Sequence, residues 1–238
     1  MKDIIRIYPD PEMSAVACAA LLDREITRLL EQKETVSVAL SGGSTPALLF
    51  KVLVDSYSDA PWKDRLKFFW VDERCVAPDD PESNYGTAKK LLLYPLGIND
   101  EMVFRIHGEN DPADEVARYT SVIQNELGPE GVIDICLLGM GSDGHTASVF
   151  PLQIKLMSAS VPVAATQNPY TGQKRITMTG KLINNSLTTI FLAHGKEKKE
   201  VLKLILDNRE RESFPAGLVI NAHEGIYWFL DTEAYRLP

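Results

Sequence analysis

The sequence predicts an α/β fold: an open, mostly parallel β-sheet with helices on both faces. Short apolar runs typical of buried strands alternate with longer stretches in which apolar residues recur at helical spacing. The clearest run, residues 133–140, leads directly into a glycine-rich turn. A strand buried on both faces reads as one apolar run, and the alternation of such strands with helices implies a parallel sheet.

The first three expected strands end at recognisable turn or loop sequences. Pro9 and Pro11 close the first, the sequence SGGSTP follows the second, and a long acidic and polar loop follows the third. In chain order, the expected strands are residues 4–8, 36–40, 66–71, 102–106, 133–140, 161–165, 175–179, 189–193 and 226–230.

The expected helices lie between these strands. Apolar residues such as Val16, Leu21 and Leu29 recur at helical spacing in the first helix. Pro46 can open the second helix, because the missing N–H of a proline is no loss in a first turn. In chain order, the expected helices are residues 13–31, 46–57, 87–94, 111–127 and 196–208.

The chain has 238 residues, 45% of them hydrophobic and 24% charged, and neither a linker nor a repeat divides it. We therefore expect one domain, residues 1–238. The formal net charge of -8 argues against binding to nucleic acid or to an anionic membrane, because both need a basic face. An acidic protein can still bind a small anion if it gathers cations in one place.

The cysteines Cys18, Cys75 and Cys136 lack CxxC spacing and imply neither a disulfide framework nor a zinc site. The first residues are too short in apolar length for a signal peptide, and no window approaches about eighteen apolar residues. We therefore expect a cytoplasmic protein. The sequence leaves open whether it is a monomer or a small homo-oligomer.

The sequence SGGSTP follows an expected strand and opens an expected helix. Backbone N–H groups and hydroxyls at such a position can bind a phosphate. The motif lacks the lysine of a P-loop and the spacing of a dinucleotide-binding turn, so it favours neither ATP nor NAD. An ordinary turn with a Ser or Thr N-cap would give the same sequence. The candidate binding residues are Ser41, Gly42, Gly43, Ser44 and Thr45.

Further candidates lie at strand ends and at a helix start. The third strand ends in Asp72, Glu73 and Arg74. The Arg74 guanidinium could bind a carboxylate or phosphate through two parallel hydrogen bonds, or it could only pair with the acids around it. Arg175 heads a later strand, and Lys196 begins a helix, where its charge opposes the macrodipole. Asp72 is a candidate substrate-binding residue.

The turn after residues 133–140 carries Asp143 and His145 between glycines. A histidine at a strand end is a natural general base or acid near neutral pH, and Asp143 can orient it. Both could instead be ordinary turn residues. The chain has neither a GxSxG nor an HExxH motif, so the sequence favours a base that activates water. The other histidines are expected to be surface or packing residues: His107, His194 and His223.

Four blocks in this order, SGGSTP, WVDERCVAPDDPESNYG, LGMGSDGHTASVFP and RITMT, resemble those of the 6-phosphogluconolactonase family. With the later GKEK and PAGLV segments, the resemblance spans nearly the whole chain. It implies an open sheet of Rossmann type and no metal or organic cofactor. The implied reaction is hydrolysis of 6-phospho-D-glucono-1,5-lactone to 6-phosphogluconate, the second step of the oxidative pentose phosphate pathway.

The resemblance also implies a role for each candidate residue. His145 would be the base that takes a proton from water, with Asp143 as its partner. The SGGST segment would face the phosphate, while Arg74 and Arg175 would hold anionic or polar substrate oxygens. Lys196 would lie near the phosphate. As a hypothesis from the chemistry itself, Arg74 or a backbone N–H would stabilise the oxyanion.

Two other functions remain open. A glucosamine-6-phosphate deaminase or isomerase would use the same DGH element with a downstream Glu, but Phe150 stands in that position here. The deaminases also have Tyr where this chain has Arg74. A non-catalytic sugar-phosphate sensor would need a DNA-binding unit ahead of the sheet, and we expect the sheet to begin at Ile4.

Overall fold

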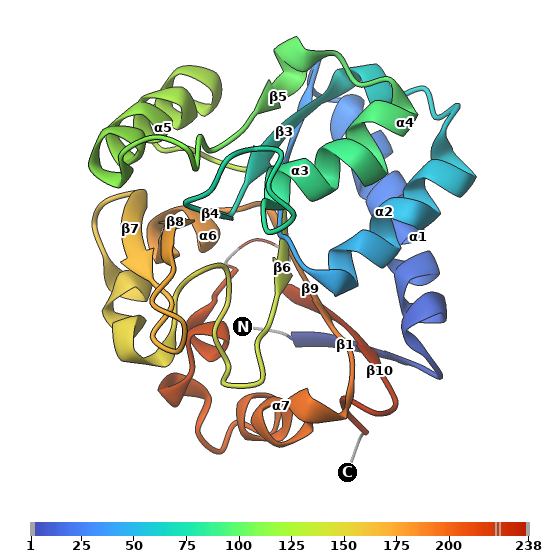
Figure 1. Cartoon of the computed structure of the whole chain (residues 1–238). Coiled ribbons are helices and arrows are strands. Elements are labelled where there is room, and N and C mark those ends of the chain that lie inside the picture. The colour runs from blue at the N-terminus through green and yellow to red at the C-terminus, as the bar shows by residue number, and fades with distance from the viewer. Residues whose placement is uncertain (1–2, 222, 224, 237–238) are drawn as a thin grey trace.

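The computed structural model describes residues 3–221, 223 and 225–236 of the chain. Within these residues, seven strands form one parallel sheet in the order β1-β10-β9-β6-β2-β3-β5 (Figure 1). The predicted fold class is confirmed. The strands of this sheet are β1 (Asp3–Tyr8), β2 (Val36–Leu40), β3 (Leu66–Trp70), β5 (Val103–Phe104), β6 (Ile135–Gly139), β9 (Thr188–Ala193) and β10 (Ile226–Asp231).

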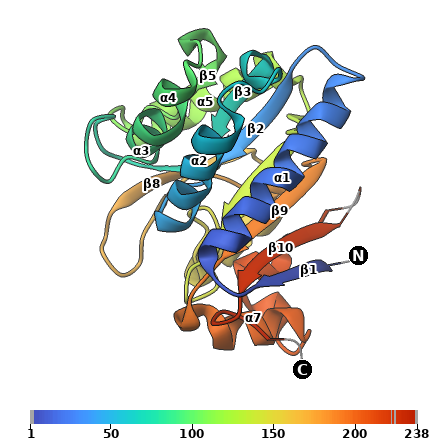
Figure 2. The same ribbon diagram turned by 90° about the vertical axis from the view of Figure 1, so that its right-hand side faces the viewer.

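Helices cover both faces of the sheet. α1 and α2 pack side by side against one face (Figure 2), and α5 lies on the other side (Figure 1). Among the described residues, no helix combines the length and the apolar character that a membrane crossing requires. The α-helices are α1 (Pro11–Leu30), α2 (Ser44–Tyr57), α3 (Asn84–Ala88), α4 (Tyr94–Leu96), α5 (Pro112–Leu127), α6 (Gly180–Ile183) and α7 (Lys199–Leu206).

Side-chain caps explain where two of the helices begin. Asp10 accepts a hydrogen bond from the Met13 N–H at 2.7 Å and so starts α1 slightly before the predicted boundary. Ser83 accepts one from the Gly86 N–H at 2.9 Å, so the helix predicted over 87–94 already begins at residue 84. From residue 89 to 93 this helix continues as a π-helix.

A second, antiparallel sheet, which the sequence did not predict, has the order β4-β8-β7 in the described residues. Only residues 168–173 join β7 to β8, whereas a parallel pairing needs a crossover of about a dozen residues or more. β4 continues from β3 through Val71, whose carbonyl accepts the Met178 N–H at 2.7 Å. The chain therefore passes directly from the end of β3 into the second sheet. Its strands are β4 (Asp72–Arg74), β7 (Val163–Gln167) and β8 (Lys174–Met178).

The strand order creates a crevice between β2 and β6. From β2 the chain continues outward to β3 and β5, whereas from β6 it continues outward to β9 and β10. The connections after β2 and β6 therefore leave in opposite directions at the carboxyl edge, where ligands bind in open parallel sheets. Ser41, directly after β2, bridges this edge by donating to the Leu137 carbonyl of β6 at 2.8 Å.

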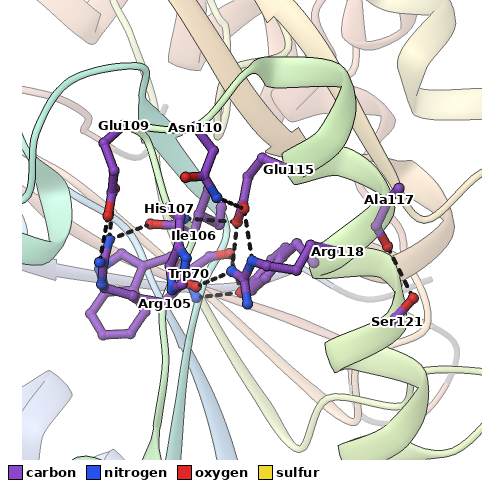
Figure 3. A network of polar contacts seen from close by, with 11 residues as sticks. Trp70, Arg105, Ile106, His107, Glu109, Asn110, Glu115, Ala117, Arg118 and Ser121 are labelled. Atoms are coloured by element: carbon purple, nitrogen blue, oxygen red, sulfur yellow. Dashed lines mark hydrogen bonds and ion pairs between the residues drawn. The ribbon is translucent and has the colours of Figure 1, made fainter.

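A buried carboxylate, that of Glu115 in α5, organises the loop after β5 (Figure 3). It accepts hydrogen bonds from the His107 N–H at 2.7 Å and from Asn110 Nδ2 at 3.0 Å. Arg118 donates to both of its oxygens, at 2.6 and 2.7 Å. The loop packs closely on the second sheet, because a Cβ at Gly108 would lie 2.1 Å from a carbonyl oxygen of β4.

Replacing Glu115 by Ala should lower the free energy of unfolding by about 2–4 kcal/mol, because Arg118, Asn110 and a backbone N–H lose their acceptor. Burial raises the pKa of Glu115, but its hydrogen bonds, led by those of Arg118, hold it below the ordinary value of 4.5. A carboxylate with a lowered pKa stabilises the fold above its unfolded-state pKa and loses this effect as pH falls. Denaturant unfolding at several pH values measures the difference in unfolding free energy between the wild type and Glu115→Ala. This difference should shrink below pH 4.5.

Asp114→Ala is the matched control, since Asp114 is an exposed carboxylate next to Glu115 on the same helix. Removing this carboxylate should lower the free energy of unfolding by less than about 1 kcal/mol, because only its interaction with the helix dipole disappears. If both variants lost the same free energy of unfolding, the buried network around Glu115 would not have the proposed importance.

Candidate active site

A cavity opens at the carboxyl edge of the parallel sheet, in the crevice beside β2 and β6. It gathers segments that are far apart in the sequence, from the loops after β2, β6 and β9 and from the second sheet. Of the residues predicted to form the site, all but Asp143 and Lys196 line it. The lining residues are Ser41, Gly42, Gly43, Ser44, Thr45, Pro46, Asp72, Arg74, Asn84, Gly139, Met140, Gly141, His145, Ala147, Arg175, Leu192 and Lys198.

The glycine-rich turn after β2 leaves the N-terminus of α2 open toward this cavity. α2 begins at Ser44, two residues before the predicted Pro46, and its N-cap is Gly43 with a φ of 102°. Within the described chain no side chain caps the first turn, which sets aside the alternative of an ordinary Ser or Thr cap. The uncapped N–H groups and the hydroxyls of Ser44 and Thr45 suit an anion.

Arg74 of β4 and Arg175 of β8 face each other across the second sheet. They are register partners in an antiparallel pair, which is unfavourable for like charges. The buried Nε of each arginine has no hydrogen-bond partner among the described residues. Asp72 compensates Arg175 in part, with 3.8 Å between Asp72 Oδ2 and Arg175 Nη1. Two buried donors without acceptors in one cavity wall are suited to anionic or polar ligand oxygens.

The acids around Arg74 are engaged elsewhere, which disfavours a purely structural role for its guanidinium. Arg74 Nη1 donates to the Glu82 carbonyl oxygen and not to a carboxylate. The buried Glu73 carboxylate instead accepts the backbone N–H groups of Arg74 and Asn84, each at 2.7 Å, and that of Tyr85 at 2.8 Å. Burial raises the pKa of Glu73, although these donors oppose the rise. Glu73 thus fastens β4 to the start of α3.

Asn84 lines the cavity but was not among the predicted site residues. Its Nδ2 donates to the Asp72 carbonyl at 2.9 Å, while its buried Oδ1 has no partner in the part of the chain that the structure describes. A Cβ at Gly42 would lie 1.7 Å from this Oδ1, so a glycine is required there. Asp72, in turn, accepts a hydrogen bond from Ser148 Oγ at 2.5 Å. The sequence signalled Asn84 only as part of the block that follows β3.

His145 and Asp143 form a hydrogen-bonded pair in the turn after β6. His145 Nδ1 lies 2.6 Å from Asp143 Oδ1, which also accepts the His145 backbone N–H at 3.1 Å. The turn is tight, since a Cβ at Gly141 would lie 2.1 Å from His145 Nδ1. With Asp143 ionised, Nδ1 carries the shared proton and Nε2 is left as an acceptor. Such an imidazole, in the wall of a cavity, is suited to act as a general base.

The surroundings of this pair keep Asp143 ionised. Burial raises its pKa, but hydrogen bonds from the His145 ring and backbone and from Tyr170 lower it by more, to about 2. The imidazole also packs against Phe150, with 4.6 Å between the ring centroids. Phe150 is buried, so the imidazole contacts both a charged partner and an apolar ring.

The segment after β9 brings Lys198, and not the predicted Lys196, to the cavity. Gly195, with a φ of 96°, precedes a 3-10 turn over residues 196–198, and this turn leaves Lys196 exposed. Burial lowers the pKa of Lys198, although Glu197 and Asp231 oppose the shift. The sequence shows two lysines two residues apart, and helical periodicity alone does not say which one faces inward.

The remaining histidines lie outside this cavity lining. His194 is buried, and its Nε2 lies 2.8 Å from Ser14 Oγ, while His223 is exposed. The described residues contain no cluster of His, Cys, Asp and Glu side chains that could hold a metal ion. The chemistry that the cavity residues themselves provide is proton transfer by an imidazole beside a group of anion-binding donors.

Residues 9–228 match the family described as glucosamine-6-phosphate isomerases/6-phosphogluconolactonase. A 6-phosphogluconolactonase of Treponema pallidum is 44% identical over 192 residues, which cover 79% of each chain. One of Haemophilus influenzae is 44% identical over 206 residues, 85% of this chain and 87% of the relative.

Solved structures show the same relationship. The crystal structure of the 6-phosphogluconolactonase from Thermotoga maritima superposes with a TM-score of 0.86 at 28% identity, covering 97% of this chain and 100% of that one. The three-dimensional structure of the 6-phosphogluconolactonase from Trypanosoma brucei superposes with a TM-score of 0.85 at 29% identity. The match covers 98% of this chain and 97% of that one. This chain therefore belongs to the family of glucosamine-6-phosphate isomerases and 6-phosphogluconolactonases.

Proposed function

We propose that the protein is a 6-phosphogluconolactonase, which hydrolyses 6-phospho-D-glucono-1,5-lactone to 6-phosphogluconate in the oxidative pentose phosphate pathway. The observation that carries the proposal is that His145, paired with Asp143, shares one cavity with two arginines whose Nε atoms have no partner among the described residues. The names of the relatives at 44% identity support it.

In the proposed mechanism, His145 Nε2 takes a proton from a water molecule as that water attacks C1 of the lactone. The negative charge that develops on the carbonyl oxygen is stabilised by Arg74 or a backbone N–H. The protonated imidazole then delivers its proton to the ring oxygen as the C1–O bond breaks. Asp143 holds the ring throughout and stabilises its charged form.

We assign the phosphate to the N-terminus of α2 and to Lys198. Both line the cavity, and both place positive charge or N–H donors there. Arg175 and Asn84 are assigned to the remaining oxygens of the substrate. This assignment replaces Lys196 by Lys198, because Lys196 is exposed.

The family also contains isomerases, but Phe150 disfavours that activity here. Aldose–ketose isomerisation needs a second group that carries a proton, and the phenyl ring against His145 cannot supply one. Hydrolysis needs only one base, because water provides the proton that the leaving oxygen receives. We propose a cytoplasmic location, which the three free thiols, two of them fully buried, support.

His145→Ala should lower kcat by about 10²- to 10⁴-fold, because general base assistance is lost while the phosphate ligands remain. The assay follows the disappearance of freshly generated lactone, with spontaneous hydrolysis subtracted. His223→Ala, at an exposed histidine, serves as the control and should retain wild-type turnover. Wild-type turnover in the His145 variant would refute the mechanism, and release of ammonia from glucosamine 6-phosphate would favour the deaminase instead.

Lys198→Ala should raise the KM for the lactone by about 10- to 100-fold, because a charge-assisted hydrogen bond to the phosphate is removed. Lys196→Ala is the matched control, a lysine of the same turn that faces solvent, and its KM should stay within about twofold of wild type. Steady-state kinetics on both variants measures the difference. A larger effect at Lys196 than at Lys198 would show that the phosphate lies elsewhere.

A further inference from the structure

Tyr170, in the loop between β7 and β8, contacts the catalytic pair from outside the cavity lining. Its hydroxyl donates to Asp143 Oδ2 at 2.8 Å, while Asp143 Oδ1 lies 2.6 Å from His145 Nδ1. We propose that Tyr170 is a positioning residue of the active site, which fixes the Asp143 carboxylate so that it holds His145 toward the cavity. This proposal rests on the function proposed above.

The ring of Tyr170 also contacts the same pair indirectly, through Phe150. It packs edge-on against Phe150, with 6.3 Å between the ring centroids, and Phe150 packs against the His145 ring. Tyr170 is 71% exposed, so burial contributes little to its placement. The hydroxyl contact with Asp143 and the ring contact with Phe150 are therefore what hold this side chain over the pair.

The loop that carries Tyr170 is ordered by its own hydrogen bonds. Asn168 Oδ1 accepts the backbone N–H groups of Tyr170 at 2.9 Å and Thr171 at 3.2 Å. Gln167 Nε2 donates to the Gly172 carbonyl at 2.6 Å, and Gly172 adopts a φ of 75° that favours glycine. The backbone position of Tyr170 is thus set by the hairpin itself.

The contact matters because a carboxylate can rotate about its Cβ–Cγ bond. With donors on Oδ1 alone, from the ring and the backbone of His145, the plane of the Asp143 carboxylate could still turn, whereas a donor on Oδ2 as well holds the plane. The hydrogen bond to Asp143 raises the pKa of Tyr170 above its ordinary value of 10, so the hydroxyl keeps the proton that it donates. The same hairpin also carries Arg175. Tyr170, which contacts the catalytic pair, and an anion-binding arginine are therefore held by the same two strands.

Tyr170→Phe tests the proposal, because it removes the hydroxyl and keeps the ring against Phe150. We expect kcat to fall about two- to tenfold with an unchanged KM, the effect of losing one hydrogen bond that acts on the base. In the ligand-free protein, the downfield proton NMR signal of the Asp143–His145 hydrogen bond should shift or exchange faster. Tyr94→Phe, at another exposed tyrosine, should change neither measurement.

An unchanged kcat in Tyr170→Phe would overturn the proposal. So would a raised KM at constant kcat, since Tyr170 would then contact the substrate directly. If the wild-type protein left the lactone intact, the proposed function would fail, but the NMR comparison would still decide on Tyr170. In that case an unchanged signal overturns the positioning role and a changed one supports it.

Discussion

The candidate active site depends on the short pairing between β2 and β6. Their ladder covers only Val38 with Ile135 and Ala39 with Cys136, whereas β6 pairs with β9 over its whole length. The two central strands therefore part before their carboxyl ends, and the Ser41 hydroxyl bridges the gap by its bond to the Leu137 carbonyl. The glycine-rich turn after β2 and the turn with Asp143 and His145 after β6 both leave from this opening, because the two strands run in the same direction.

Three cationic side chains gather in the cavity at this edge of the sheet. The chain carries a formal net charge of -8, yet Arg74, Arg175 and Lys198 all line one cavity. Placing two arginines opposite each other in an antiparallel pair opposes folding, and Asp72 and the hydrogen-bonded Glu73 offset only part of this repulsion. A bound anion would offset the rest, which is why a phosphorylated substrate suits this site better than a neutral one.

Much of the fold and site could be predicted because the relevant signals are local. The apolar runs located the strands, and glycine-rich turns at strand ends located the α2 N-terminus and the pair of Asp143 and His145. The second sheet escaped prediction because its pairing depends on the short 168–173 connection and on β4, not on alternation. Lys198 was missed because a 3-10 turn, and not an α-helix, sets which lysine faces inward. Tyr170 lies in a loop, where periodicity carries no signal.

The surroundings of the imidazole explain how one family scaffold can favour hydrolysis. In the proposed mechanism Asp143 holds the proton on Nδ1, so Nε2 is the basic atom, and the apolar ring of Phe150 packs against the same imidazole. A single basic atom suffices when the nucleophile is water, because the proton taken from it is returned to the leaving oxygen of the same substrate. Aldose–ketose isomerisation also moves protons on and off the substrate oxygens, which calls for a further proton-carrying group. Position 150 offers a phenyl ring instead, which favours the proposed chemistry, in which proton removal and proton return both pass through one nitrogen of His145.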